Sequence, residues 1–235
     1  MSEANTAPRV LMVFPKFYEN SMWNFKEAME LQGARAPAPP LGLITLAAML
    51  PPAWQVTLVN RNCEELTDAQ IQAADLVMTG GMLPQEPDCL VVIDRCVALG
   101  TPVCVGGPAP TSTPEVYDKA DFLVLGEAEG ILDKFVAAWE AGERRGRLTA
   151  EKFKADVTKS PIPRFDLLTF SHYLYIGVQF SRGCPFTCEF CDIIELYGRA
   201  PRTKTTPQML AELDRLYGLG YRGHVDFVDD NLIGN

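Results

Sequence analysis

Short apolar runs alternate with helical segments through the first 143 residues, and this alternation constrains the fold more than any other feature of the chain. The runs are four or five residues long and contain β-branched side chains, as expected for strands buried on both faces. The expected strands are 10–14, 55–59, 75–79, 102–105 and 122–125, and the expected helices are 41–50, 67–74, 87–99 and 131–139. Five strands with intervening helices predict an α/β fold with a Rossmann-like, doubly wound parallel sheet.

Glycine-containing turns follow three of the expected strands, at the sheet edge where folds of this kind bind ligands. Glycine has no Cβ and lets the backbone approach a ligand closely, although each turn taken alone is more typical of a simple tight turn. Together the turns make a nucleotide-like ligand a candidate. The residues concerned are Gly80, Gly81, Gly106, Gly107, Pro108, Gly126 and Glu127. No G-x-G-x-x-G sequence follows the first strand, so a nicotinamide or flavin dinucleotide is not indicated.

The composition changes after the first domain. Between Glu143 and Leu168 the chain is rich in charge and proline, which predicts a linker. After it we expect a strand over 175–180, a helix that begins at Thr206 with Pro207 at its first position, and a strand over 224–228. Strand, helix and strand in this order predict the first segment of a β/α barrel. The predicted organisation is a domain over 1–143, a linker over 144–170 and the start of a second domain over 171–235.

Three cysteines with C-x3-C-x2-C spacing, Cys184, Cys188 and Cys191, lie in the second domain. Three thiolates on one loop can hold three irons of a [4Fe-4S] cluster and leave the fourth iron open, as catalytic metal sites require. Structural zinc and a disulfide framework are the alternatives. Zinc needs a fourth ligand, and neither histidine of the chain has the usual paired spacing; the odd number of cysteines disfavours disulfides. The other cysteines, expected to be buried and inert, are Cys63, Cys89, Cys96 and Cys104.

Composition restricts the class of protein further. Apolar residues make up 47% of the chain, enough for a buried core. A net charge of −9 argues against a nucleic-acid-binding surface. The apolar run 41–50 is too short to span a bilayer, and the first nine residues lack the apolar core of a secretory signal. These features predict a cytoplasmic enzyme without a transmembrane segment, free or peripheral to the membrane.

The cysteine loop, with Gly183 before its first cysteine and Phe190 before its last, resembles the signature of the radical S-adenosylmethionine (SAM) enzymes. A Rossmann-like domain ahead of such a loop resembles the cobalamin-binding class of these enzymes. Further segments resemble the branch that contains the hopanoid C-2 methylases. These segments are 23–26, 39–42, 106–108, 125–129, 179–183, 198–204 and 227–231.

This resemblance implies roles for individual residues. Cys184, Cys188 and Cys191 would ligate the cluster, and its open iron would chelate SAM. Phe190 would lie against the adenine, and residues 229–231 (Asp229, Asp230 and Asn231) would bind the SAM amino group or ribose; a solvated strand end is the alternative for these three. The basic residues that would meet the SAM carboxylate or a cobalamin phosphate, unless they form a solvated loop, are Arg199, Arg202 and Lys204.

Two further expectations concern cobalamin and the substrate. Residues 1–171 contain no histidine, so cobalamin would bind without a protein imidazole on cobalt, or would not bind. Four aromatic residues could form an apolar wall over the corrin or over a lipid-like substrate, with ordinary core packing as the alternative. They are Phe17, Tyr18, Trp23 and Phe25.

The resemblance implies a cobalamin-dependent radical SAM methyltransferase that acts on an unactivated carbon of a lipid-like or other small-molecule substrate. Its electron donor would be a flavodoxin or ferredoxin. The alternatives are a radical SAM enzyme of another reaction type, such as cyclisation, rearrangement or oxidation, and a non-catalytic cobalamin- or iron–sulfur-binding module. Because only the first segment of the barrel is present, we expect the chain to be the N-terminal portion of a longer enzyme and inactive alone.

Overall fold

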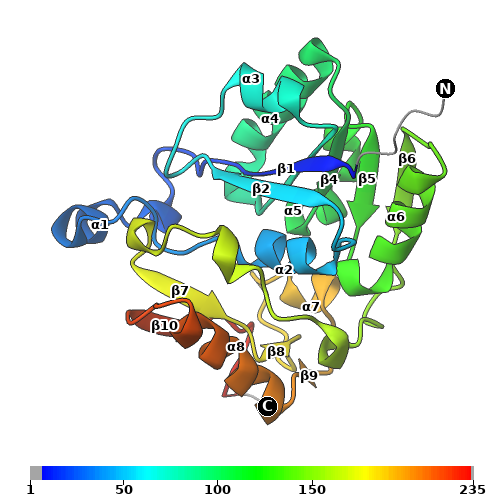
Figure 1. The fold of residues 1–235 in the computed structure, drawn as a ribbon. Coiled ribbons are helices and arrows are strands. Elements are labelled where there is room, and N and C mark those ends of the chain that lie inside the picture. Colours follow the sequence, from blue (N-terminus) through cyan, green and yellow to red (C-terminus); the bar gives the residue numbers. More distant parts are fainter. Residues whose placement is uncertain (1–6, 234–235) are drawn as a thin grey trace.

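A six-stranded parallel sheet forms the centre of the predicted first domain (Figure 1). The computed structural model describes residues 7–233. The prediction that the first nine residues are not a secretory signal therefore concerns a segment that lies largely outside the described residues. The strands are β1 (Arg9–Phe14), β2 (Gln55–Asn60), β3 (Leu76–Gly80), β4 (Val103–Gly106), β5 (Phe122–Leu125) and β6 (Gly146–Thr149). Their order is β2-β1-β3-β4-β5-β6, and every neighbouring pair is parallel. The predicted doubly wound α/β sheet is confirmed.

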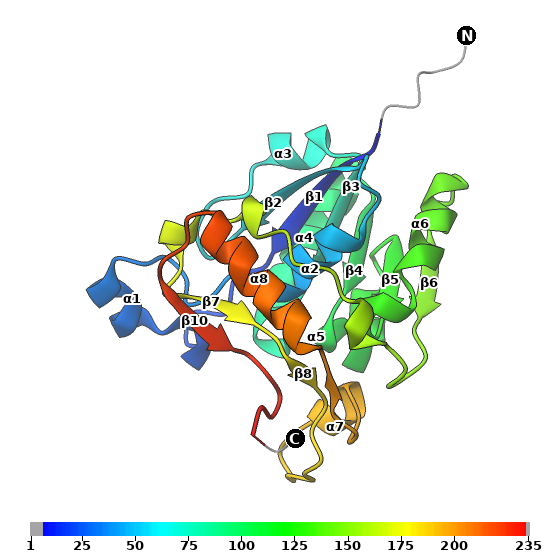
Figure 2. The same cartoon turned by 60° about the horizontal axis from the view of Figure 1, so that its bottom comes forward.

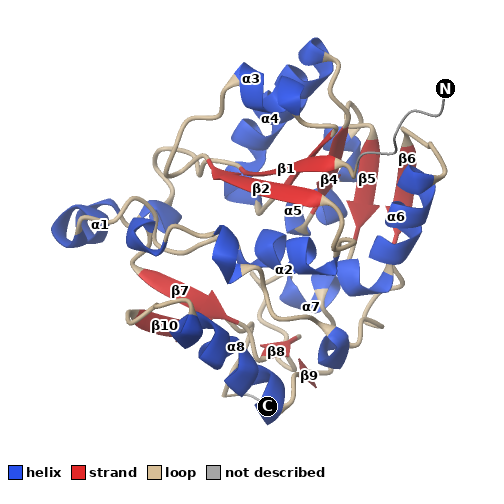
Figure 3. Cartoon of the chain, in the orientation of Figure 1, coloured by secondary structure: helices blue, strands red, loops and turns tan. Residues whose placement is uncertain are grey.

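Helices cover both faces of this sheet, as Figure 3 shows. One face packs against α3 (Asp68–Ala73) and α4 (Glu86–Leu99), and the other against α2 (Leu41–Met49) and α6 (Leu132–Glu140). Side chains of β1 alternate between two separate apolar clusters, because successive residues of a strand point to opposite faces. Among residues 7–233 no helix is long and apolar enough to cross a membrane.

Strand β6 was not predicted, and it lies inside the segment expected to be a linker. It pairs with β5 from Phe122 opposite Gly146 to Leu125 opposite Thr149. As the edge strand of the sheet it is short, and Arg147 and Thr149 are exposed to solvent. Edge strands carry charge and polar residues to discourage pairing with other chains, so their composition resembles that of a linker. Three short helices were also missed: α1 (Lys26–Gln32), α5 (Pro108–Ser112) and α7 (Ile193–Leu196).

The second domain contains the predicted strand–helix–strand segment (Figure 2). Strand β7 (Tyr175–Val178) pairs in parallel with β10 (His224–Phe227), and α8 (Thr206–Gly218) joins them. A small antiparallel pair, β8 (Ser181–Arg182) with β9 (Arg202–Thr203), carries the chain into and out of the cysteine loop. Pro207 occupies the second position of α8 rather than the first. The start of the helix is fixed one residue earlier by a capping box between Thr205 and Gln208.

Helix α2 packs between the two predicted domains. In Figure 1 it lies between the six-stranded sheet and β7. Its Ile44 side chain is fully buried in a cluster with Phe165, Tyr173 and Ile176, which all follow the first domain in sequence. The backbone carbonyl of Ile44 accepts a hydrogen bond from the Arg164 amide (2.9 Å). Both sides of α2 are therefore covered, which explains why its sequence is apolar all round rather than amphipathic.

A buried ion pair fixes α8 beside the cysteine loop. Lys204, which follows β9, donates to the Glu212 carboxylate on α8, and both side chains are buried. Burial raises the pKa of Glu212, and the bond from Lys204 opposes that rise. The second carboxylate oxygen of Glu212 has no partner. Lys204 is therefore already paired, and the contact with a SAM carboxylate or cobalamin phosphate that the sequence suggested stays a prediction.

We expect Glu212→Ala to lower the free energy of unfolding by about 3–5 kcal/mol, because it leaves the Lys204 ammonium buried without a counter-charge. Urea unfolding of the two proteins measures this difference. Replacing both partners, as Lys204→Met with Glu212→Leu, should recover most of the loss. A double variant as unstable as the single one would contradict this account.

Candidate functional site

The cysteine loop lies beyond the carboxyl end of β7, the end at which β/α barrels carry their chemistry. Cys188 is exposed, and Cys184 and Cys191 are half-buried. The Cys184 amide donates to the carbonyl of Gly198 (3.1 Å), and the Cys191 amide donates to that of Cys188 (3.1 Å), so the backbone folds back on itself. Gly183 adopts a φ of +96°, and a Cβ there would meet three carbonyl oxygens at about 3.1–3.2 Å. Only glycine fits this position without strain.

Two carboxylates that follow β10 hold the strand leading into the cysteine loop. Asp229 accepts hydrogen bonds from the amides of Phe180 (2.7 Å) and Ser181 (3.1 Å) and from the Ser181 hydroxyl (3.0 Å). Asp230 accepts one from the Gly183 amide (2.7 Å). Burial raises the pKa of Asp230, and the Gly183 amide and a nearby arginine oppose the rise. Both side chains thus have protein partners, and their predicted contact with SAM stays a prediction.

Asn231 and Phe190 are the other residues predicted to meet SAM. The Asn231 amide nitrogen lies 3.5 Å from the Cys184 sulfur, within hydrogen-bonding range of a thiol or thiolate. The Phe190 ring is 93% exposed, so it is accessible to an adenine without any rearrangement of the core. These positions agree with the predicted roles but do not test them.

Four charged residues with largely buried side chains join the cysteine loop to the first domain. Arg182 donates to Glu127 (3.0 Å) and, through both terminal nitrogens, to Glu129 (2.9 and 3.1 Å). Arg202 donates to both oxygens of Glu127 (2.9 and 2.7 Å). Glu127 and Glu129 keep only 3% and 7% of their side-chain surface exposed. Glu127 and Arg202 bind each other in the structure, since a buried charge requires a partner, and the cofactor contact predicted for both stays a prediction.

The sequence did not predict this cluster. Glu129 was not singled out, and Arg182 had no assigned role. The available signal in the sequence was the position of Glu127 and Glu129 just after a buried strand. An isolated charge is costly there, so each carboxylate would need a positively charged partner.

Glu129 should contribute to stability only when it is ionised. Burial alone would raise its pKa, but the charge and hydrogen bonds of Arg182 outweigh burial and lower the pKa from 4.5 to about 2. A carboxyl with a lowered pKa in the folded state stabilises it above the unfolded pKa and loses this effect as the pH falls toward the folded pKa. We expect wild-type protein to exceed Glu129→Gln in free energy of unfolding by on the order of 3 kcal/mol near neutral pH.

The measurement is urea unfolding of both proteins between about pH 7 and about pH 3. The difference in free energy of unfolding between wild type and Glu129→Gln should become smaller as the pH falls from 4.5 toward about 2. Glu151→Gln, at an exposed position, serves as the control and should track the wild type. A gap that does not depend on pH would contradict the assignment.

The glycines at the carboxyl edge of the first sheet pack against one another. A Cβ on Gly80 would lie 1.8 Å from the Gly106 carbonyl oxygen, and one on Gly107 would lie 3.2 Å from the Gly81 amide nitrogen. Pro108 begins α5, a favoured position because its missing N–H would be unpaired there. A Cβ on Gly126 would meet Ala150 at 3.1 Å. Close approach between neighbouring strands and loops accounts for these glycines without a ligand, so their cofactor-binding role stays a prediction.

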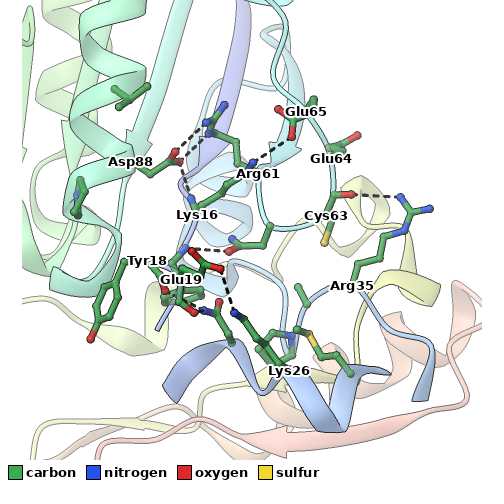
Figure 4. A pocket seen from close by; sticks show the side chains of 18 residues that line it. Lys16, Tyr18, Glu19, Lys26, Arg35, Arg61, Cys63, Glu64, Glu65 and Asp88 are labelled. Carbon is green, nitrogen blue, oxygen red and sulfur yellow. Dashed lines mark hydrogen bonds and ion pairs between the residues drawn. The ribbon is translucent and has the colours of Figure 1, made fainter. Parts of the chain in front are cut away.

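A pocket of about 840 Å³ opens at the carboxyl ends of β1 and β2 (Figure 4). Its volume is within the range typical of cofactor sites. Most of its charges are already paired: Arg61 with Asp88 (2.7 Å), and Lys16 with Glu65 (3.1 Å). Arg35 donates to the carbonyl of Cys63 at the rim. None of the glycine turns predicted to bind a ligand lines this pocket.

The four remaining cysteines agree with the expectation of inert thiols. Cys89, Cys96 and Cys104 are buried in the first domain, and Cys63 is half-buried. Burial raises the pKa of Cys63 to about 11 and of both Cys89 and Cys96 to about 12. Thiols with such pKa values stay protonated near neutral pH and are poor metal ligands.

The donor set of the cysteine loop fits an iron–sulfur cluster. Three soft sulfur donors lie on one segment, and the first and last are held by the backbone bonds described above. Within residues 7–233, no three His, Cys, Asp or Glu side chains are already gathered closely enough to hold a metal ion.

Comparison with known proteins finds methyltransferases that are similar to this chain. No family model matches the chain. The chain is 49% identical over 229 residues to an uncharacterised methyltransferase of Synechocystis sp. The alignment covers 97% of this chain and 42% of that protein. The chain is also 39% identical over 235 residues to the hopanoid C-2 methylase of Rhodopseudomonas palustris. That alignment covers 98% of this chain and 44% of the methylase. The chain is a homologue of this methylase. It spans less than half the length of these curated relatives.

Structures of the radical SAM methyltransferase TsrM from Kitasatospora setae share the fold. One superposes with a TM-score of 0.69 and 16% identity over 95% of this chain and 48% of TsrM. Another contains cobalamin and a [4Fe-4S] cluster. At this identity the likeness establishes the fold alone. The predicted resemblance and the predicted fold class are both confirmed.

Proposed function

We propose that this chain is part of a cobalamin-dependent radical SAM enzyme that methylates an unactivated carbon of a small molecule. The observation that carries the proposal is the cysteine loop: three thiols at the carboxyl end of β7, beside the carboxyl edge of a doubly wound sheet. Ligands of both fold types bind at these strand ends. The relatives named as methyltransferases support the reaction class.

Each residue of the loop has a proposed task. Cys184, Cys188 and Cys191 hold the cluster, and Phe190 offers its exposed ring to the adenine of SAM. Asp229 and Asp230 fix the strand that enters the loop and thereby orient the thiols. When bound, the cluster supplies an electron to SAM and cobalamin supplies a methyl group. The protein's share of the work is alignment and exclusion of water.

Cobalamin would bind at the carboxyl edge of the first sheet. Residues 1–171 contain no histidine, so the first domain offers cobalt no imidazole. The TsrM structure that contains cobalamin has the same fold, which supports this assignment. Absence of corrinoid absorbance after reconstitution with hydroxocobalamin would remove cobalamin from the proposal.

The substrate is proposed to be lipid-like. The name of the homologous hopanoid methylase supports this, and so do the exposed aromatic residues ahead of α1. Trp23 and Phe25 are 42% and 44% exposed, so the alternative of ordinary core packing is wrong for them. Peripheral contact with a membrane and electron supply by a flavodoxin or ferredoxin belong to the same proposal.

The test uses the native gene product, reconstituted anaerobically with iron, sulfide, hydroxocobalamin, SAM and a reductant. We expect both 5′-deoxyadenosine and S-adenosylhomocysteine, and a product heavier than its substrate by one methyl group. 5′-Deoxyadenosine without S-adenosylhomocysteine or methyl transfer would assign another radical SAM reaction. A cluster that assembles without any cleavage of SAM would identify a binding module and overturn the proposal.

A further inference from the structure

The buried charges that join the two domains also stand next to the cysteine loop. Glu127 and Glu129 follow β5, at the carboxyl edge of the first sheet. Arg182 lies in β8, two residues before Cys184, and Arg202 lies in the partner strand β9. The charge cluster, defined as these four residues, therefore connects the edge of one sheet with both strands that frame the loop.

The geometry of the charge cluster is specific. Arg182 bridges the two carboxylates with three bonds from both of its terminal nitrogens, an arrangement that lysine cannot reproduce. Arg202 binds both oxygens of Glu127 through one terminal nitrogen. The Ser160 hydroxyl donates to Glu129 (2.7 Å), and the Tyr197 carbonyl accepts from Arg202 (2.8 Å). The bonds thus reach the segments on either side of the cysteine loop.

Stability alone gives a weak reason for this arrangement. Burying a cluster of three ion pairs costs desolvation that the Coulomb attraction barely repays, and apolar residues of similar volume often serve as well. The Nε atom of Arg202 is buried without a partner, which adds to the cost. Such an arrangement has its best-attested use in fixing register between elements.

Charge balance is the second feature. The cluster holds two positive and two negative side chains in a buried setting, where charges are poorly screened. Removing either kind leaves a net charge beside the loop. A positive charge close to an iron–sulfur cluster favours its reduced, more negative form, and a negative charge favours the oxidised form.

We propose that Glu127 and Glu129 are positioning residues for the iron–sulfur cluster: acting through Arg182 and Arg202, they hold the cysteine loop against the first sheet and neutralise the positive charge beside it. This inference rests on the proposed function, because it requires a cluster on Cys184, Cys188 and Cys191. It adds a role for the first domain in setting the reduction potential of a group that the second domain ligates.

The test is a redox titration of the reconstituted native gene product, followed by electron paramagnetic resonance. Glu127→Gln should shift the midpoint potential upward, and Arg182→Gln should shift it downward. The double variant removes one charge of each sign and should lie between the two. Asp94→Asn, which disrupts an exposed ion pair with Lys119, is the matched control and should leave the potential unchanged.

Opposite shifts in the two single variants would support the inference, because a merely structural defect has no reason to depend on the sign of the lost charge. Equal potentials, or shifts in the same direction, would overturn it. If circular dichroism shows that a glutamine variant does not fold, Glu127→Asp and Arg182→Lys replace the two glutamine variants. Both retain the charge of the wild-type residue, so an unchanged midpoint potential with reduced cluster occupancy would support the positioning role. Unchanged cluster occupancy would refute that role. Failure of the wild type to assemble any cluster would instead refute the proposed function.

Discussion

Replacing Cys188 with alanine should abolish binding of the proposed [4Fe-4S] cluster to the native gene product. A cluster held by three thiolates has no spare protein ligand, so loss of one leaves two irons unprotected. Cys188 is exposed, and its removal should leave the fold intact. Iron and sulfide contents measured after anaerobic reconstitution should fall to background, and 5′-deoxyadenosine should no longer form from SAM.

Cys63→Ala is the matched control for this experiment. Its thiol is half-buried with a pKa raised to about 11 by burial, and it lies in the first domain. The variant should bind iron and sulfide as the wild type does. A Cys188→Ala protein that retained wild-type iron would show that another residue completes the site, and the assignment of the open iron to SAM would fail.

Gly80→Ala should destabilise the first domain by about 3 kcal/mol or more. The new Cβ would lie 1.8 Å from the Gly106 carbonyl oxygen. Gly80 and Gly106 are paired residues of two neighbouring central strands, β3 and β4. Neither residue can move away from the other without breaking the backbone hydrogen bonds between β3 and β4. Denaturant unfolding, monitored by circular dichroism, measures the loss of free energy of unfolding.

Gly42→Ala provides the comparison. Gly42 lies in helix α2, and a Cβ there would meet nothing within 4 Å. Alanine favours a helix over glycine, so this variant should be more stable than the wild type by roughly 0.5–1 kcal/mol. Equal stability of the two variants would contradict the claim that the sheet-edge glycines are required for strand packing.

The sequence predicted the sheet well where its strands are buried. Val10 to Val13 are buried on both faces of β1, and such runs have few alternatives to a central parallel strand. Strand β6 was missed because an edge strand with Arg147 and Thr149 facing solvent has no apolar signature. The start of α8 at Thr206 was predicted from Pro207, because a proline favours the first turn of a helix, where its missing N–H would be unpaired.

The candidate site was predictable only where its chemistry is local. The three cysteines stand within eight residues, so their spacing alone suggested a shared metal group. Contacts between distant segments left no such pattern: Asp230 lies 47 residues from Gly183, and Glu127 lies 75 residues from Arg202. The glycine turns were interpreted as ligand contacts because sequence cannot tell whether a close approach involves a ligand or a neighbouring strand.

Helix α2 has a consequence for any attempt to take this protein apart. It is encoded within the first domain, yet Ile44 completes the apolar core beneath β7, and the Arg164 amide bonds to its carbonyl. A fragment ending at the predicted boundary would expose this side of the helix to water and invite aggregation. Chimaeras that graft a foreign cofactor domain onto this cysteine loop would therefore need to carry α2 along with the recipient half.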